Sequence, residues 1–151
     1  MIRFILISLL LILPMKVMAT KMDKDLTFKN TGPVYVFVND QATGGCWTNI
    51  KEVRDYAIGL IEIKGGKIAE TRDDAIVVGV FLDILVNAMR IPDLNACVAH
   101  VAIYLKTPAW AIHNADLYGE LVLSRHDFVG FQSGNLNITI LEQVQKALQE
   151  W

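Results

Sequence analysis

Residues 75–88 read AIVVGVFLDILVNA and are the most hydrophobic stretch that follows the N-terminal segment. Every even-numbered position from Ile76 to Ala88 is apolar, whereas the odd-numbered positions also hold glycine, aspartate and asparagine. This alternation, together with the many β-branched residues, predicts a long strand with one fully buried face. A buried helix that begins near Asp73 and Asp74 is the alternative, because an apolar run of this length fits either period.

A second alternating segment lies at residues 97–106. One of its faces carries Cys97, Ala99, Val101, Ile103 and Leu105. The other face is more polar and carries Val98, His100, Ala102, Tyr104 and Lys106. Residues 91–95 (IPDLN) have the composition of a turn, so we expect a hairpin of strands 75–88 and 97–106. Thr107–Pro108 is expected to end the second strand.

Two helices are expected to flank these strands. The first follows a capping-box pair, Asn49 and Glu52, with Thr48 as a competing N-cap, and ends at Gly65–Gly66. The last helix is expected to begin at the second such pair, Thr139 and Glu142.

Two more strands complete the prediction. Residues 33–38 (PVYVFV) and 118–124 are rich in β-branched and aromatic residues, and 125–134 is expected to be a loop. The resulting order is β-α-β-β-β-α. It predicts an α+β fold: a two-layer sandwich of a mostly antiparallel four-stranded sheet with two helices on one face.

Residues 1–19 (MIRFILISLLLILPMKVMA) have the features of a cleaved secretory signal. Arg3 supplies the positive charge, and Val17 and Ala19 are small residues before the expected cleavage point. The apolar run at 4–13 is shorter than the about 20 residues that span a bilayer, and an uncleaved anchor is the alternative. We therefore expect a flexible lead-in at 20–32 and a single domain at 33–151.

The charge balance argues against a nucleic-acid partner. The chain has 14 Lys and Arg and 16 Asp and Glu, a formal charge of −2; loss of Arg3 and Lys16 with the signal makes this −4. An acidic exported chain does not suit polyanions or anionic lipid. The periplasm is the expected compartment, with the extracellular medium as the alternative, and no membrane span is expected after cleavage.

The two cysteines, Cys46 and Cys97, are expected to form one disulfide. Export places them in an oxidising compartment, and an even count allows a single bridge. A free nucleophilic thiol at Cys46, close to a helix N-terminus, is the alternative. The sequence contains no C-x-x-C motif of the thioredoxin type.

A polar sheet face is the first candidate binding surface. Asp83 interrupts an apolar strand, and the polar face of the next strand offers His100, Tyr104 and Lys106 as neighbours. Such a group is either a surface cross-strand pair or a contact surface for a partner. A second candidate is the loop that holds Gly44, Gly45 and Trp47, where the glycines permit a tight turn or close approach of a partner.

Catalytic and metal chemistry have weaker support. His126 and Asp127 are adjacent, and His113 and Asp116 offer a second histidine–carboxylate pair, but catalysis requires that such side chains converge in space. The spacing of the three histidines does not match a metal-binding motif, so no metal or cofactor is expected.

The expected function is therefore that of a small exported, non-enzymatic protein. It would bind another envelope or exported protein through the open sheet face or an edge strand. A hydrolase with scattered His and Asp residues and a small-ligand carrier are the alternatives, and the sequence does not indicate the oligomeric state.

Overall fold

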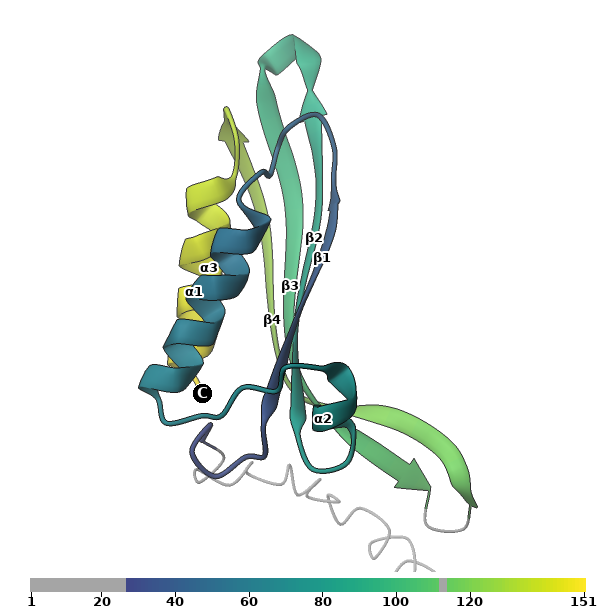
Figure 1. The fold of residues 1–151 in the computed structure, drawn as a ribbon. Helices are drawn as coiled ribbons and strands as arrows, with labels where there is room; N and C mark the ends of the chain where they lie inside the picture. The colour runs from purple at the N-terminus through teal and green to yellow at the C-terminus, as the bar shows by residue number, and fades with distance from the viewer. Residues whose placement is uncertain (1–26, 112–113) are drawn as a thin grey trace, which may run out of the picture.

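The computed structural model describes residues 27–111 and 114–151, and its backbone is a layer of two long helices on one side of a four-stranded sheet (Figure 1). The strands and helices, in chain order, are β1 (Val34–Ala42), α1 (Ile50–Ile63), α2 (Arg72–Ile76), β2 (Val80–Ile91), β3 (Ala96–Ala111), β4 (Asn114–Ser133) and α3 (Asn137–Gln149).

The sheet has the strand order β1-β2-β3-β4. β1 and β2 are parallel and are connected through α1 and α2, whereas β2 with β3 and β3 with β4 are antiparallel. The predicted α+β class, with a mostly antiparallel sheet and its two longer helices on one face, is confirmed.

The main core lies between the sheet and the two helices α1 and α3. The even-numbered side chains of β2 from Val80 to Ala88 are buried there, as are the odd-numbered ones of β3 from Cys97 to Leu105. The helices contribute one buried stripe each: Val53, Ala57 and Ile61 from α1, and Ile140, Val144, Ala147 and Leu148 from α3. The alternation in both central strands therefore predicted the correct buried face.

The first part of the 75–88 segment is not a strand. Thr71 and Asp74 form a capping box that starts α2, so the helical alternative holds for Arg72–Ile76. The strand begins only at Val80 and continues to Ile91. The turn predicted at 91–95 is present as a short 3-10 turn (Pro92–Leu94) followed by Asn95 in the left-handed conformation.

β3 and β4 are longer than predicted, and the predicted break at Thr107–Pro108 is wrong. Pairing between β2 and β3 ends at Phe81 and Lys106, so beyond Lys106 the strand β3 pairs only with β4. Proline is tolerated at a strand edge, where no neighbouring strand needs its missing N–H. A loop is expected at 125–134 from the sequence, but β4 continues to Ser133.

The predicted capping boxes of the two longer helices do not form. Asn49 precedes α1, but its side chain accepts a hydrogen bond from Trp47 and donates one to Glu52 instead of capping the backbone. α3 begins at Asn137, two positions before Thr139, whose hydroxyl donates to Gln132 of β4. The predicted end of α1 is confirmed, with Gly65 at φ +81°.

The predicted signal (1–19) and most of the predicted lead-in (20–26) lie outside the described residues. Within the remainder of the lead-in, Phe28 is buried and its ring contacts that of Trp151 edge-on, with centroids 6.3 Å apart. None of the helices in the described part is long and apolar enough to cross a membrane.

Candidate functional site

The side of the sheet opposite α1 and α3 is called the open face here. It carries Tyr35, Phe37, Asn39 and Gln41 of β1; Phe81, Asp83, Leu85, Asn87 and Met89 of β2; Val98, His100, Ala102, Tyr104 and Lys106 of β3; and Glu120, Val122, Arg125, Asp127, Val129 and Phe131 of β4. The short helix α2 covers one end of it, where Ala75 packs against the buried ring of Phe81.

Four charged side chains near α2 form a connected set, called the charged network. The ammonium of Lys106 donates to Asp83 at 2.5 Å and to Glu120 at 3.2 Å. Arg72 of α2 donates to Glu120 at 2.9 Å, and its guanidinium lies 5.5 Å from the centre of the Phe81 ring. Two cations and two carboxylates therefore balance one another between α2 and strands β2, β3 and β4.

The charged network is partly sheltered from water. The side chains of Asp83 and Lys106 are 15% and 17% exposed, so their attraction is screened less than that of a fully exposed pair. Burial alone would lower the pKa of the Lys106 ammonium, but hydrogen bonds and attraction from Asp83 and Glu120 outweigh it and raise that pKa. Lys106 is therefore a permanent cation at physiological pH.

A second polar cluster lies next to the charged network on the open face. Tyr104 contacts two cations, since the charged groups of Lys106 and Arg125 each lie 5.2 Å from its ring centre. Arg125 pairs with Asp127, which also lies 3.1 Å from the imidazole of His100. Hydrogen bonds from Arg125, and secondarily from His100, lower the pKa of the Asp127 carboxyl despite some desolvation.

The four residues predicted for the binding face lie on this face together. Asp83 contacts Lys106, as the sequence indicated, but His100 pairs with Asp127 and Tyr104 with the two cations. The sequence reading missed Arg72 and Glu120. They lie 48 positions apart, and no local pattern indicates that they meet.

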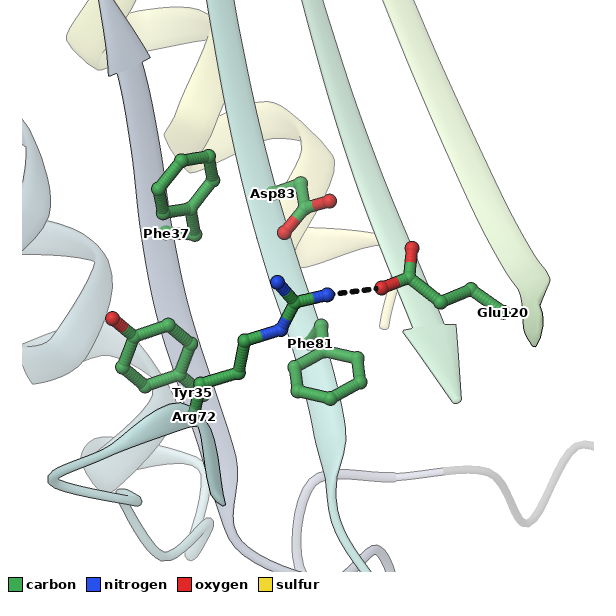
Figure 2. A pocket seen from close by; sticks show the side chains of 6 residues that line it. All are labelled: Tyr35, Phe37, Arg72, Phe81, Asp83 and Glu120. Atoms are coloured by element: carbon green, nitrogen blue, oxygen red, sulfur yellow. Dashed lines mark hydrogen bonds and ion pairs between the residues drawn. The ribbon is translucent and has the colours of Figure 1, made fainter. Parts of the chain in front are cut away.

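Three members of the charged network, Arg72, Asp83 and Glu120, line a hollow of about 210 Å³ (Figure 2). It is lined by Tyr35, Phe37, Arg72, Phe81, Asp83 and Glu120. Its volume is below the roughly 300 Å³ at which pockets for organic ligands usually begin. A wider depression of about 360 Å³ lies at the other end of the open face, against Met89, Val98 and His100.

Large apolar side chains on the open face remain in contact with solvent. They are Phe37 (44% exposed), Val122 (47%), Met89 (59%), Phe131 (61%) and Val129 (73%). Met89 and Phe131 both lie beside Val98 in the register, and Val129 lies two positions from Phe131 on the same face of β4, so these side chains form one apolar area. Exposed apolar areas of this kind mark sites where a protein contacts another surface.

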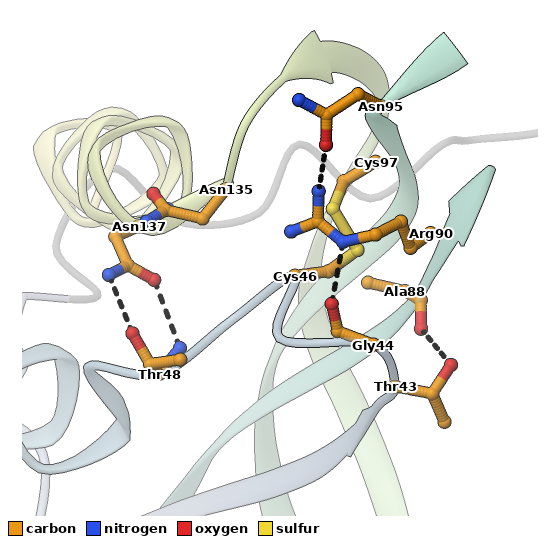
Figure 3. Close-up of a disulfide and its surroundings, with 10 residues drawn as sticks. All are labelled: Thr43, Gly44, Cys46, Thr48, Ala88, Arg90, Asn95, Cys97, Asn135 and Asn137. Carbon is orange, nitrogen blue, oxygen red and sulfur yellow. Dashed lines mark hydrogen bonds between the residues drawn. A yellow bond between two sulfur atoms is a disulfide. The ribbon is translucent and has the colours of Figure 1, made fainter. Parts of the chain in front are cut away.

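The second predicted candidate, the loop with Gly44, Gly45 and Trp47, lies at the disulfide (Figure 3). Cys46 and Cys97 are bonded, with Cα atoms 5.6 Å apart, and the described residues contain no free cysteine. The carbonyl of Gly44 accepts a hydrogen bond of 2.7 Å from Arg90, and the ring of Trp47 is buried. These contacts join the loop to the β2–β3 hairpin.

The same region is also tied to the last helix. The backbone N–H of Leu136 donates to the carbonyl of Cys46, and Thr48 and Asn137 exchange two hydrogen bonds of 2.9 and 3.0 Å. The disulfide loop therefore connects both layers of the fold at one end of the sheet.

Two of the residues considered for catalysis, His126 and Asp127, have described side chains, and these lie on opposite faces of the sheet. His126 points to the helix side, where its ring lies 3.0 Å from Gln143 of α3, whereas Asp127 points to the open face. Asp116 belongs to β4, and His113 lies outside the described residues. Among the residues that the structure describes, no three His, Cys, Asp or Glu side chains are grouped as metal ligands.

Comparison of the chain with protein-family models, with curated proteins and with solved structures gives no match. The chemistry of the open face is therefore the basis on which a function can be argued.

Proposed function

We propose that this chain is an exported, non-enzymatic protein that binds another exported protein through the open face of its sheet. The observation that carries the proposal is the composition of that face: exposed apolar side chains border charged side chains that already pair with one another. The occupant would be a folded protein surface with its own apolar and hydrogen-bonding groups.

This composition matches the anatomy of protein interfaces. Such surfaces combine aromatic residues, methionine and arginine with polar groups that are held in place before binding. On the open face, the guanidinium of Arg125 lies over the ring of Tyr104, and Phe37 and Met89 offer apolar contacts. Because the paired carboxylates and cations offset one another, this face favours a mixed surface over a polyanion.

Export is supported by two independent features. Residues 1–19 have the pattern of a cleaved signal, and the Cys46–Cys97 disulfide is a bond that persists in oxidising compartments. The periplasm is the compartment proposed, with the extracellular medium as the alternative.

The two alternative functions have less support. A hydrolase would need His126 and Asp127 to act together, but they lie on opposite faces of the sheet. A carrier of small ligands would need an enclosed cavity between the layers, and both hollows described above lie on the open face.

The test is a cross-linking pull-down of the tagged chain from the envelope fraction of its own cells, read by mass spectrometry. Met89→Glu places a charge on the open face, and Ile63→Glu, on the helix layer, is the matched control because Ile63 is equally apolar and is 83% exposed. We expect one stoichiometric partner, reduced at least about tenfold by Met89→Glu and unchanged by Ile63→Glu. No stoichiometric partner, or one that both variants capture equally, would overturn the proposal.

A further inference from the structure

Strand β4 forms an edge of the sheet along its whole length. It spans Asn114–Ser133 and is the last strand in the sheet order, and within the described part of the chain it pairs with β3 alone. A long edge offers unpaired N–H and C=O groups to any other extended chain, and proteins usually guard it with lysine or other charges, proline, a bulge or a covering segment. β4 contains neither lysine nor proline; it has one bulge, at Leu123, and its neighbouring charges at Arg125 and Asp127 have opposite signs.

The opposite edge is guarded. Val34 of β1 is bridged by Ile68, whose neighbours Lys67 and Ala69 bond to its backbone, and Arg54 of α1 donates to the carbonyl of Val36 at 3.4 Å. Covering groups are therefore present on β1 and not on β4 among the described residues. This difference singles out β4 as the strand that is open to a partner.

We propose that β4 pairs antiparallel with β4 of a second copy of this chain, about a two-fold axis at His126, so that two sheets become one of eight strands. In this register Arg125 lies opposite Asp127 of the second copy, and Asp127 lies opposite its Arg125. The proposal concerns the strand edge and does not depend on the partner proposed for the open face.

Charge complementarity selects this register among its neighbours. An axis at Asp127 would place that carboxylate against its own copy, and an axis at Arg125 would do the same for the guanidinium. Directly opposed like charges destabilise a strand pair, and opposite charges stabilise it. The axis at His126 creates two opposite-charge pairs at once.

The bulge at Leu123 of β4 brings a pair of apolar side chains opposite each other in the same register. Leu123 is skipped in the pairing with β3, because Ser124 pairs with Leu105 and Val122 with the next residue, Lys106. If the same residue is skipped across the new interface, Val122 lies opposite Val129 of the second copy. Both valines are exposed in the single chain, so pairing would bury apolar surface on the same face as the ion pairs.

A two-fold axis perpendicular to the sheet places both helix layers on the same side of the joined sheet. α3 lies over the inner side of β4, where His126 contacts Gln143 and Ser124 accepts a hydrogen bond from Trp151. Neighbouring strands are about 4.8 Å apart and packed helices about 8–10 Å apart, so one helix covers two strands. Two α1–α3 layers would therefore meet side by side across the axis.

The test measures the mass of the purified chain in solution by sedimentation equilibrium across the micromolar range. We expect a dimer for the natural sequence. Arg125→Asp would oppose two carboxylates at each pair and Asp127→Arg two guanidinium groups, so each variant should raise the dimer dissociation constant about tenfold or more. Lys51→Asp, on the exposed surface of α1, makes the same charge change away from β4 and should leave the dimer intact.

Two further samples, in which opposite charges face each other again, make the test specific. The double variant Arg125→Asp/Asp127→Arg exchanges the charges and should dimerise again. An equimolar mixture of the two single variants should form a heterodimer, because each supplies the charge that the other lacks. Circular dichroism of every variant confirms that the fold is kept.

A monomeric natural chain would overturn the proposal, and so would single variants that dimerise like it or mixtures that stay monomeric. Loss of the dimer with unchanged capture of the envelope partner would leave the proposed function standing. Loss of the partner with an unchanged dimer would refute that function alone.

Discussion

The ammonium of Lys106 lies 2.5 Å from a carboxylate oxygen of Asp83, although the two residues are 23 positions apart in the chain. They meet diagonally across β2 and β3, since Asp83 is paired with Tyr104 and Lys106 with Phe81. Both side chains are mostly shielded from solvent. The polar centre of the open face is therefore part of the sheet structure and not a loose set of surface charges.

Replacing Lys106 by methionine should destabilise the protein. Asp83 would lose its cation in a sheltered position, which we expect to lower the free energy of unfolding by about 1–3 kcal/mol. The double variant Lys106→Met/Asp83→Asn should recover part of this loss, because no unpaired charge is left. Urea unfolding of the single and double variants measures the coupling, and strictly additive losses would contradict it.

The sequence predicted the layers of the fold because the alternation in β2 and β3 is strong on both sides of a clear turn. The prediction from sequence was wrong where contacts between distant residues outweigh the local sequence pattern. Residues 125–134 look like a loop because they contain two glycines, yet Arg125, His126 and Asp127 each have a partner on one or the other side of β4. Their side chains alternate between solvent and the helix layer, as a strand requires.

The candidate site was predictable only in part, for the same reason. Asp83 and Lys106 could be placed on one face because both lie in strands of strict alternation. Arg72 could not, since it belongs to a five-residue helix that begins before the apolar run and overlaps its start, and its partner Glu120 lies beyond the proline expected to end β3. Long-range ion pairs leave no periodic signal in a single sequence.

Removal of the disulfide should cost a large part of the stability. Cys46 and Cys97 are 51 positions apart, and the loop-entropy model gives about 4 kcal/mol for a loop of this length. We expect Cys46→Ala/Cys97→Ala to lower the free energy of unfolding by that order, measured by urea unfolding. Thiol titration of the denatured natural protein should find no free sulfhydryl, and two free thiols would contradict the assignment.

Gly44 and Gly45 provide a matched pair of substitutions. Both have left-handed backbones, with φ of +66° and +69°, so alanine at either position should cost about 1–2 kcal/mol. A Cβ on Gly44 would also lie 2.8 Å from Cβ of Arg90, whereas one on Gly45 would meet nothing within 4 Å. Thermal unfolding should therefore show a larger loss for Gly44→Ala than for Gly45→Ala, and equal losses would refute the close contact.

The ionisation of Asp74 should make the stability of the protein depend on pH in the acid range, at the helix that supplies Arg72 to the charged network. Asp74 starts α2, the helix that carries Arg72, and hydrogen bonds from the hydroxyl and then the backbone N–H of Thr71 lower the pKa of its carboxyl below 3.8. A carboxyl whose pKa is lower in the folded state contributes stability above its unfolded pKa and loses it as the pH falls through the folded value.

Asp74→Asn resembles the protonated form, so the variant should be less stable than the natural chain at neutral pH. The two should converge below pH 3.8, as followed by thermal unfolding across the acid range. In a Thr71→Ala background, which lacks the hydroxyl donor, the stability difference between the chains with and without Asp74→Asn should change less with pH. If the stability difference between the natural chain and Asp74→Asn stays constant with pH, the capping box contributes no ionised hydrogen bond.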